Sequence, residues 1–419
     1  MSSIKISQEI PKCGEYDVIV AGGGVAGVAS AVSSARMGLK TLLIEKTISL
    51  GGLATIGLVN FFVPMCNGRG KYIIKGMCQE FLELAIKYGF DTIPKEWKNG
   101  EPEEPTNVRY FSRFSAPVFV LALTELVKNE GVDILYDTVV SRPIMEGNVC
   151  KGLIVENKSG TEYYEGKIIV DATGDADILY RAGVPTVQGG NFHTFYGFIS
   201  NLDTCKKAID KEDISLVSNH IFGGRSNLYG GGHPEGKPLW KGTDVRDVTE
   251  YVVENHIELL EEFKKYDRMT NDLVLIPTMP QFRTTRRIDG DFTLKESDKY
   301  KHFDDSIGAI CDFDRADYLY EMPYGTMIKS GFPNLITVGR TTSGEGYGWD
   351  LLRVIPPAII TGQVSGVAAA LAIKENCGID KVDVSKMQEI LENQNVMIHF
   401  DDAWIQEGKG GEKVKVGHI

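Results

Sequence analysis

Near its start the chain alternates apolar strands with a helix. Residues Tyr16 to Ala21 form an apolar run rich in Val and Ile, which is typical of a buried strand, and Thr41 to Glu45 form a second such run. Between them, Val28 to Met37 consists mostly of small residues and is predicted to be a helix, with Gly38 at the place of its C-terminal cap. This order predicts a β-α-β unit with two parallel strands.

The turn between the first strand and the helix carries three glycines, spaced Gly22-x-Gly24-x-x-Gly27. Gly22 permits a tight turn, Gly24 lets the backbone approach a pyrophosphate, and Gly27 lets the helix pack closely on the strand. The pyrophosphate then lies at the positive N-terminus of the helix. Glu45 follows the last glycine by 18 residues, where a carboxylate accepts hydrogen bonds from a ribose hydroxyl. Such an acid fits NAD or FAD and would repel the extra phosphate of NADP.

The rest of the pattern predicts an α/β fold with an insertion. Helices are expected at residues 73–88, 117–129 and 356–378, and strands at 132–140, 149–156, 161–171 and 335–338. From Gly183 to about Glu321 the character changes, because aromatic strand-like pieces mix with an amphipathic helix and no phosphate-binding pattern is recognisable. We therefore expect a nucleotide-binding domain interrupted by an α+β substrate domain.

Three later segments favour FAD over NAD. With Gly51-Gly52-Leu53-Ala54-Thr55, Val170 to Asp175 and Leu335 to Ile373, the chain resembles the FAD-dependent oxidoreductases of the two-dinucleotide-binding-motif, glutathione-reductase-like fold, in particular the GG-x-A-T flavoproteins. The resemblance covers roughly residues 14–375. It implies FAD as the cofactor and leaves the substrate open.

The resemblance and the patterning together give a domain prediction. Residues 14–185 and 322–378 are expected to form a discontinuous, Rossmann-like FAD-binding domain. Residues 186–321 are expected to form the inserted α+β substrate domain, and residues 379–419 a C-terminal helix and tail.

The expected cofactor-binding residues gather at the ends of the predicted strands and at the glycine-rich turns. They are Gly22, Gly24, Val25, Ala26, Gly27, Glu45, Lys46, Gly52, Ala54, Thr55, Val139, Ala172, Thr173, Gly174, Asp175, Gly339, Arg340 and Arg353. In the resembled family the last long helix points its N-terminus at the pyrimidine edge of the flavin, where a positive dipole stabilises negative charge. Two alternatives stay open: Asp175 either contacts the flavin or caps the helix after it, and Arg353 binds a phosphate or anionic substrate or forms a surface ion pair.

The expected catalytic residues lie outside the glycine motifs. His193 and Tyr196 are candidates for a proton relay beside the flavin, as is Tyr324, because acid/base groups suit the oxidation of a C–H or O–H bond. Arg286 is the fourth candidate, and with Arg283 and Arg287 it lines either a carboxylate pocket or a solvated strand face.

Composition narrows the partners. The chain has a net charge of −12 and no long basic run, so we expect no nucleic-acid partner. The N-terminal residues lack an apolar core of signal-peptide length and the most apolar stretch contains prolines and glycines, so we expect a cytoplasmic protein with no membrane contact. The seven cysteines include no C-x-x-C pair, which argues against a metal or iron–sulfur site. Cys66 is either an ordinary apolar residue or a covalent attachment point for flavin.

These observations predict an FAD-dependent oxidoreductase that oxidises or reduces a small organic substrate by hydride transfer. No second strand–GxGxxG–helix unit is found, so electrons are expected to pass to oxygen, to an electron-carrier protein or to a second substrate. The alternatives are a flavin monooxygenase and a flavin-bearing electron-transfer subunit of a larger complex. Self-association into a homo-oligomer stays open.

Overall fold

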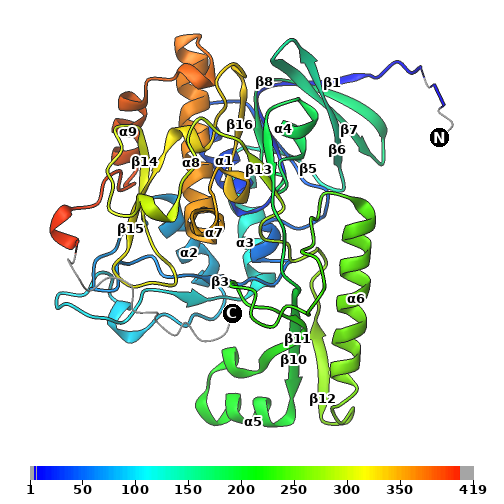
Figure 1. The fold of residues 1–419 in the computed structure, drawn as a ribbon, viewed down its shortest axis with the longest axis vertical. Helices are drawn as coiled ribbons and strands as arrows, with labels where there is room; N and C mark the ends of the chain where they lie inside the picture. The colour runs from blue at the N-terminus through cyan, green and yellow to red at the C-terminus, as the bar shows by residue number, and fades with distance from the viewer. Residues whose placement is uncertain (1–3, 6, 406–419) are drawn as a thin grey trace.

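A seven-stranded sheet forms the centre of the protein (Figure 1). Across the sheet the strands are β5 (Asp133–Leu135), β2 (Thr41–Ile44), β1 (Lys12–Ala21), β8 (Gly160–Asp171), β7 (Val149–Asn157) and β6 (Val139–Glu146), and β16 (Leu335–Thr337) also pairs with β8. Strands β5, β2, β1, β8 and β16 run parallel, whereas β7 and β6 form an antiparallel hairpin on β8. This arrangement is seen in a computed structural model that describes residues 4–5 and 7–405.

Strand β8 carries two partners on one edge. Its first half pairs with β7 and its last residues pair with β16, and Asn334 fills the fork between them. The Asn334 side-chain amide donates to the carbonyls of Cys150 (2.7 Å) and Lys167 (2.9 Å), and its oxygen accepts the backbone N–H of Cys150 (2.9 Å). The fork keeps the carboxyl end of β8 within the parallel part of the sheet, where open α/β sheets bind ligands.

Helices α1 (Val25–Arg36) and α8 (Ile355–Glu375) pack directly on each other. Glycines make this approach possible, because a Cβ on Gly362 would lie 2.3 Å from the carbonyl oxygen of Ala26 and one on Gly366 would lie 2.5 Å from the Ser33 Oγ. Helix α8 is long and apolar enough to cross a membrane by length and composition, but its apolar window is wholly buried inside the protein, as the sequence predicts for a core helix. The other helices of the main body are α2 (Met77–Lys87), α3 (Ala116–Asn129), α4 (Asp177–Arg181), α7 (Tyr347–Arg353) and α9 (Val384–Asn393).

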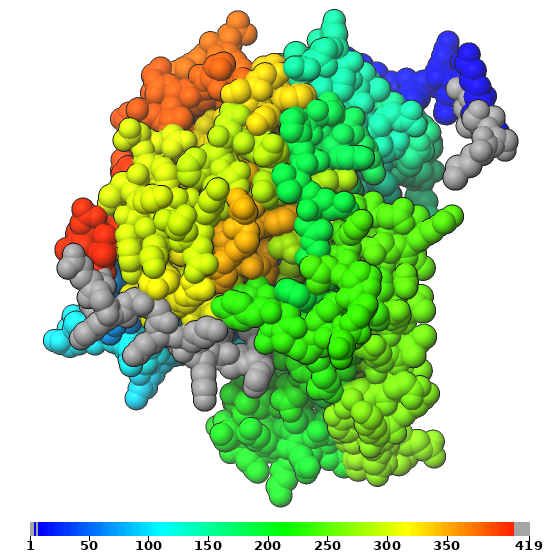
Figure 2. All heavy atoms as spheres, in the orientation of Figure 1, coloured from blue at the N-terminus to red at the C-terminus, as the bar shows by residue number. Residues whose placement is uncertain are grey.

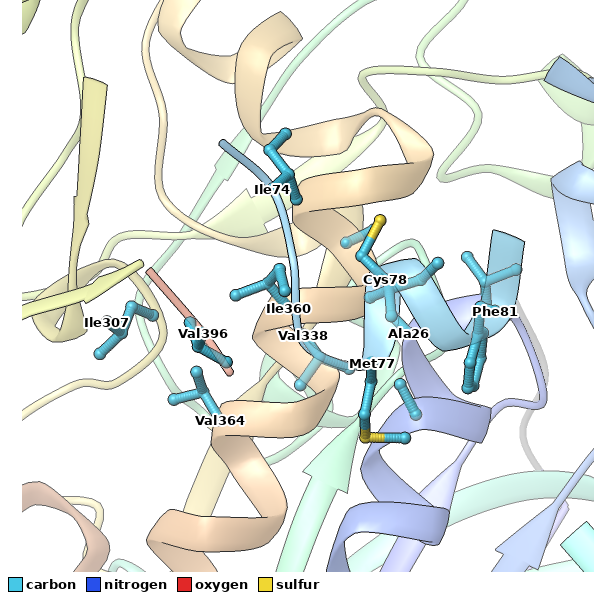
Figure 3. Packing of buried hydrophobic residues seen from close by; sticks show 14 of the residues in the cluster. Ala26, Ile74, Met77, Cys78, Phe81, Ile307, Val338, Ile360, Val364 and Val396 are labelled. Atoms are coloured by element: carbon cyan, nitrogen blue, oxygen red, sulfur yellow. The ribbon is translucent and has the colours of Figure 1, made fainter. Parts of the chain in front are cut away.

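The largest apolar core lies on one side of this sheet. Figure 3 shows side chains of this core from α1 (Ala26), α2 (Phe81) and α8 (Ile360), together with Val338, directly after β16. The pair β14 (Ser306–Cys311) and β15 (Leu319–Pro323) contributes Ile307 to the same core. The core therefore joins segments from both ends of the chain around α8.

A smaller α+β region forms one end of the molecule, shown in green at the bottom of Figure 2. Its antiparallel sheet has the order β11 (Ser218–Arg225), β10 (Thr194–Asn201), β12 (Asn271–Leu275), with α5 (Leu202–Lys211) following β10. Helix α6 (Val245–Phe263) packs on this sheet through a separate core that includes Phe195 and Tyr251. The predicted fold class, an α/β nucleotide-binding fold with an inserted α+β region, is confirmed. The exact domain boundaries stay a prediction, and residues 406–419 of the predicted tail lie outside the described residues.

Two short strand pairs make up the remaining strands of the described residues. They are β3 (Phe61–Phe62) with β4 (Ser112–Arg113), and β9 (Thr186–Gln188) with β13 (Arg286–Ile288).

Candidate functional site

A cavity of about 270 Å³ lies where β1, β2 and β8 end, and we call it the nucleotide cavity. Eleven of the predicted cofactor-binding residues line it: Gly22, Gly24, Glu45, Lys46, Gly52, Val139, Ala172, Thr173, Gly174, Asp175 and Arg340. They come from six separate stretches of chain, which the parallel sheet brings to one edge.

The glycine turn has the geometry that the three predicted roles require. Gly22 has φ of +113°, a conformation that side chains with a Cβ rarely adopt, and a Cβ on Gly27 would lie 1.9 Å from the Gly22 oxygen. A Cβ on Gly24 would meet no protein atom within 4 Å, so that Gly24 leaves open space on the cavity side. The residues present therefore fit a bound dinucleotide whose pyrophosphate lies against the Gly24 backbone at the N-terminus of α1.

Two roles were predicted as alternatives for Asp175, a contact with the flavin and a cap on the following helix. In the structure Asp171 and not Asp175 bonds to that helix. Buried Asp171 accepts the backbone N–H groups of Ile178 and Leu179 at 2.9 Å, so Asp171 supports the start of α4. Burial raises the pKa of Asp171. Asp175 makes no capping hydrogen bond to α4 and instead pairs with Arg340, with 2.9 Å between Oδ1 and the guanidinium. The capping alternative for Asp175 is therefore wrong, and Asp171 was missed because it reads as the last residue of a strand.

The other predicted cofactor residues near the glycine turn are not among the described residues that line the nucleotide cavity, and they pack in the elements around it. Val25, Ala26 and Gly27 form the first turn of α1, and the Thr55 hydroxyl donates to the Leu50 carbonyl. Gly339 packs against α1, where a Cβ would lie 2.9 Å from the Ala26 side chain. Ala54 is buried in the main core. Lining residues that the prediction did not select include Thr47, Leu53, Ile56, Thr138, Asp177, Arg181 and Met279.

A second cavity, of about 390 Å³, has mostly apolar walls, and we call it the apolar cavity. Phe192, Leu239 and Trp349 are among its walls, and Val354, directly before α8, also lines it. The indole N–H of Trp349 donates to the carbonyl of Arg340 at 2.7 Å, which connects a wall of one cavity to a wall of the other. The stretches 52–63 and 279–284 each begin in the wall of the nucleotide cavity and end in the wall of the apolar cavity, so the two cavities follow each other along the same segments of chain.

Charged groups line one part of the apolar cavity. Arg353 pairs with Asp350 (2.6 Å), whereas the guanidinium of Arg283 donates only to the backbone carbonyl of Gln281 (3.0 Å) among the described residues. Burial, and then repulsion from Arg353, lowers the pKa of Arg283. Of the alternatives for Arg353, the structure has an ion pair, but at the wall of a cavity rather than at the surface.

The three neighbouring arginines have different surroundings. Arg286 bonds the carboxylate of Asp177 (2.5 Å) and stacks over Tyr180, and Arg287 donates to the Ser343 hydroxyl (3.0 Å). Of the three, Arg283 lines the apolar cavity, and neither Arg286 nor Arg287 is among the described residues that line it or the nucleotide cavity. The solvated strand face that was open as an alternative is wrong for Arg286 and Arg287, which are buried.

The four predicted catalytic residues do not come together in the described structure. The Nε2 of His193 lies 2.8 Å from a Glu258 carboxylate oxygen, and buried Tyr196 donates to the carbonyl of Leu58 at 3.2 Å. Neither residue lines the nucleotide or the apolar cavity.

Tyr324 and Arg286 are likewise absent from the described lining of both cavities. The Tyr324 hydroxyl donates to the carbonyl of Ile379 at 2.8 Å inside the main core, and burial raises the pKa of Tyr324. Cys66 is also buried in this core, where its sulfur accepts the backbone N–H of Tyr110 at 3.0 Å. This environment supports an ordinary structural role for Cys66.

One cluster of metal-ligand side chains was not foreseen. His302, Glu321 and His399 bring one potential ligand atom each within 4.8 Å of one another. The three are far apart in sequence, so their spacing carried no signal.

Comparisons with known proteins agree with the nucleotide cavity. A family model described as FAD dependent oxidoreductase matches residues 17–196 and 233–391. The tRNA uridine 5-carboxymethylaminomethyl modification enzyme MnmG of Lactobacillus johnsonii is 32% identical over 174 residues, which cover 39% of this chain and 24% of that enzyme. The enzyme of the same name from Geobacillus thermodenitrificans is 29% identical over 190 residues, covering 41% of this chain and 27% of that enzyme.

The match thus spans about a quarter of the length of these curated relatives. Among solved structures, a geranylgeranyl bacteriochlorophyll reductase-like protein from Thermoplasma acidophilum is 15% identical, with 91% of this chain and 84% of that chain covered and a TM-score of 0.47.

These relatives correct one prediction. The exclusion of a nucleic-acid partner rested on the net charge of −12, and it is wrong, because enzymes named for tRNA modification are among the relatives of this chain. An overall charge does not separate the chain from that class of flavoprotein.

Proposed function

This chain belongs to the family of FAD-dependent oxidoreductases, and from that premise we propose that it transfers a hydride between FAD and a small organic substrate held in the apolar cavity. The observation that carries the proposal is the hydrogen bond from Trp349, in the wall of the apolar cavity, to the carbonyl of Arg340, in the wall of the nucleotide cavity (2.7 Å). The nucleotide cavity accounts for the dinucleotide part of FAD, and the apolar cavity next along the same segments offers the space for a substrate.

FAD supplies the hydride chemistry when it is bound, so the protein has to bind it, orient it and exclude water. The Gly24 backbone and the α1 N-terminus would hold its pyrophosphate, and Glu45 would accept from its ribose. Val354 lies at the N-terminus of α8, and the positive end of this helix dipole would favour negative charge in the apolar cavity. Phe192, Leu239 and Trp349 would keep water away from the substrate.

The first experiment is an absorbance spectrum of the purified protein before and after acid precipitation. Flavin bands that move into the supernatant would mean FAD held without a covalent bond, in agreement with buried Cys66. Small alcohols, amines and acids would then be screened by anaerobic bleaching of the flavin. A colourless protein that cannot be reconstituted with FAD would contradict the proposal.

A cavity-filling variant tests where the substrate binds. Leu239 lines the apolar cavity, so Leu239→Trp is expected to raise KM for a bleaching substrate while the FAD content is unchanged. The control is Leu202→Trp, at a leucine exposed on α5. Unchanged kinetics in Leu239→Trp would place the substrate elsewhere.

A second candidate is an activity on tRNA, because relatives that match part of this chain are named for tRNA modification. Filter binding of bulk tRNA separates the two candidates. Salt-sensitive binding in the micromolar range would favour tRNA, and absence of binding would favour the small substrate.

A further inference from the structure

We propose that the apolar cavity binds an organic acid, with the carboxylate of the ligand on Arg283 and its apolar body against Trp349 and Leu239. This inference rests on the proposed function, because it names the substrate class of the same cavity. It is drawn from the charges that line the cavity and from how the protein positions them.

Charge is the first argument. The charged side chains in the cavity wall are Arg283, Arg353 and Asp350, of which Arg353 and Asp350 neutralise each other (2.6 Å). One positive charge is left over, and it belongs to Arg283, which has no carboxylate within ion-pair distance among the described residues. An unpaired charge among apolar walls is costly, and an anionic ligand removes that cost.

The contrast with the adjacent arginines supports this assignment. Arg286 is paired with Asp177, and Arg287 bonds a hydroxyl and a carbonyl oxygen. Arg286 is thus neutralised by a carboxylate, and Arg287 is bonded to neutral groups and is not among the described residues that line either cavity, whereas Arg283, which bonds one carbonyl, faces the apolar cavity. A guanidinium binds a carboxylate through two parallel hydrogen bonds, which makes it well suited to this class of ligand.

Arg283 is also held in place before any ligand arrives. The side-chain oxygen of Asn191 accepts the backbone N–H groups of Arg283 (2.6 Å) and Thr284 (2.9 Å), and the Asn191 amide donates to the carbonyl of Trp240 (3.0 Å). Asn191 is buried and all its polar groups are used. A backbone fixed in this way lowers the entropy lost when Arg283 binds a ligand.

Size and wall composition define the rest of the ligand. A volume of about 390 Å³ lies within the range of small-molecule sites, about 300–1,000 Å³. Phe192, Leu239 and Trp349 provide aromatic and aliphatic surface. We therefore expect a monocarboxylate with an apolar body rather than a sugar or a nucleotide.

The test compares carboxylates with their neutral amides on the FAD-loaded protein. Benzoate, phenylacetate and cinnamate are each titrated beside the matching amide, and binding is followed by calorimetry and by the change in flavin absorbance. At least one acid is expected to bind about tenfold or more tightly than its amide. Arg283→Leu is expected to abolish this preference, and Arg283→Lys to keep part of it as a point charge. Arg246→Leu, at an exposed position of α6, is the control.

The outcomes separate this inference from the proposed function. If the wild type holds FAD but no acid binds more tightly than its amide, or if the preference survives in folded, FAD-loaded Arg283→Leu, the inference is overturned and the proposed function stands. If the wild type binds no FAD, the proposed function fails. Thermal unfolding of each variant shows whether a loss of binding reflects a loss of folding.

Discussion

The backbone N–H of Gly23 donates a hydrogen bond of 2.6 Å to the Glu45 carboxylate. The other oxygen of Glu45 accepts the backbone N–H of Thr47 at 2.8 Å, and the side chain is 7% exposed. Glu45 therefore ties the glycine turn after β1 to the loop after β2, in addition to its predicted contact with a ribose. Together with the backbone hydrogen bonds Gly22 N–H to Ile44 and Gly51 N–H to Gly23, this carboxylate holds the walls of the nucleotide cavity in place.

Glu45→Gln is expected to weaken FAD binding by about tenfold or more, because the neutral amide has one acceptor oxygen for the two backbone N–H groups of Gly23 and Thr47 and leaves the other facing a donor. Quenching of FAD fluorescence by the apoprotein measures the Kd. Glu9→Gln, at an exposed position before β1, is the control. An unchanged Kd would mean that the turn keeps its shape without Glu45.

Substitutions of two glycines of the motif by alanine are expected to have different effects, one on FAD binding and one on stability. A Cβ on Gly24 meets only open space, so Gly24→Ala should keep its thermal stability and raise the Kd for FAD at least about tenfold, by blocking the approach of the pyrophosphate. A Cβ on Gly27 would lie 1.9 Å from the Gly22 oxygen, so Gly27→Ala should lose about 1–3 kcal/mol of stability.

Differential scanning calorimetry and FAD titration of the two variants give the comparison. The prediction fails if Gly24→Ala unfolds as early as Gly27→Ala, or if it binds FAD like the wild type.

The glycine cradle could be predicted from the sequence because its signal is local: turn, helix start and strand end lie within thirty-five residues. The predicted strand 132–140 is confirmed at β5 and at the start of β6, but it is interrupted between them for a reason that is not local. Asp137 has φ of +48°, and the N–H groups of Asp137 and Thr138 donate to carbonyls of Thr47 and Glu45, so the chain turns between β5 and β6. Tertiary hydrogen bonds outweighed the apolar run there.

The apolar cavity could not be predicted for the same kind of reason. Its walls come from chain segments as distant as Val59 and Val354, and no short motif links them. His193 and Tyr196 drew attention as polar groups in an aromatic segment, but residues around β10 pack into cores on both of its faces. Between two cores, His193 bonds Glu258 and Tyr196 bonds the carbonyl of Leu58. Neither His193 nor Tyr196 is therefore among the described residues that line the two cavities.

Asn334 is expected to matter for stability and not for chemistry. It closes the fork on β8 with three hydrogen bonds, two of them buried and one partly buried, so Asn334→Ala should cost about 3 kcal/mol. Urea unfolding followed by far-UV circular dichroism measures this loss, with Asn107→Ala at an exposed loop position as the control. A loss no larger than that of the control would mean that the strand pairs hold the fork alone.

The substitution Tyr324→Phe tests whether this predicted catalytic residue has a structural role instead. Its hydroxyl bonds the carbonyl of Ile379 in the core, so Tyr324→Phe should lose about 1 kcal/mol of stability and leave kcat and the pH profile unchanged. The measurement is steady-state turnover with an added artificial electron acceptor that reoxidises the flavin, between pH 6 and pH 9, together with urea unfolding. A fall in kcat of tenfold or more at unchanged stability would return Tyr324 to the active site.

His302 is expected to make stability depend on pH. Its two ring nitrogens face two carboxylates, Glu321 at 2.6 Å and Asp402 at 2.9 Å, and His399 bonds the same Glu321 oxygen at 3.0 Å. The contact with Asp402, and then that with Glu321, raises the pKa of His302 above its usual value of about 6.5. A raised pKa in the folded state contributes stability below about pH 6.5, and this contribution is lost as the pH rises through the folded pKa.

Wild type and His302→Gln are therefore compared by urea unfolding at pH 5.5, 7 and 9. The variant should be less stable at pH 5.5, and the difference should shrink by pH 9. His256→Gln, at an exposed histidine of α6, should show no such trend. If the difference grew with pH, His302 would stabilise the protein as a neutral imidazole. Its charge would then contribute nothing to the contacts with Glu321 on β15 and Asp402 after α9.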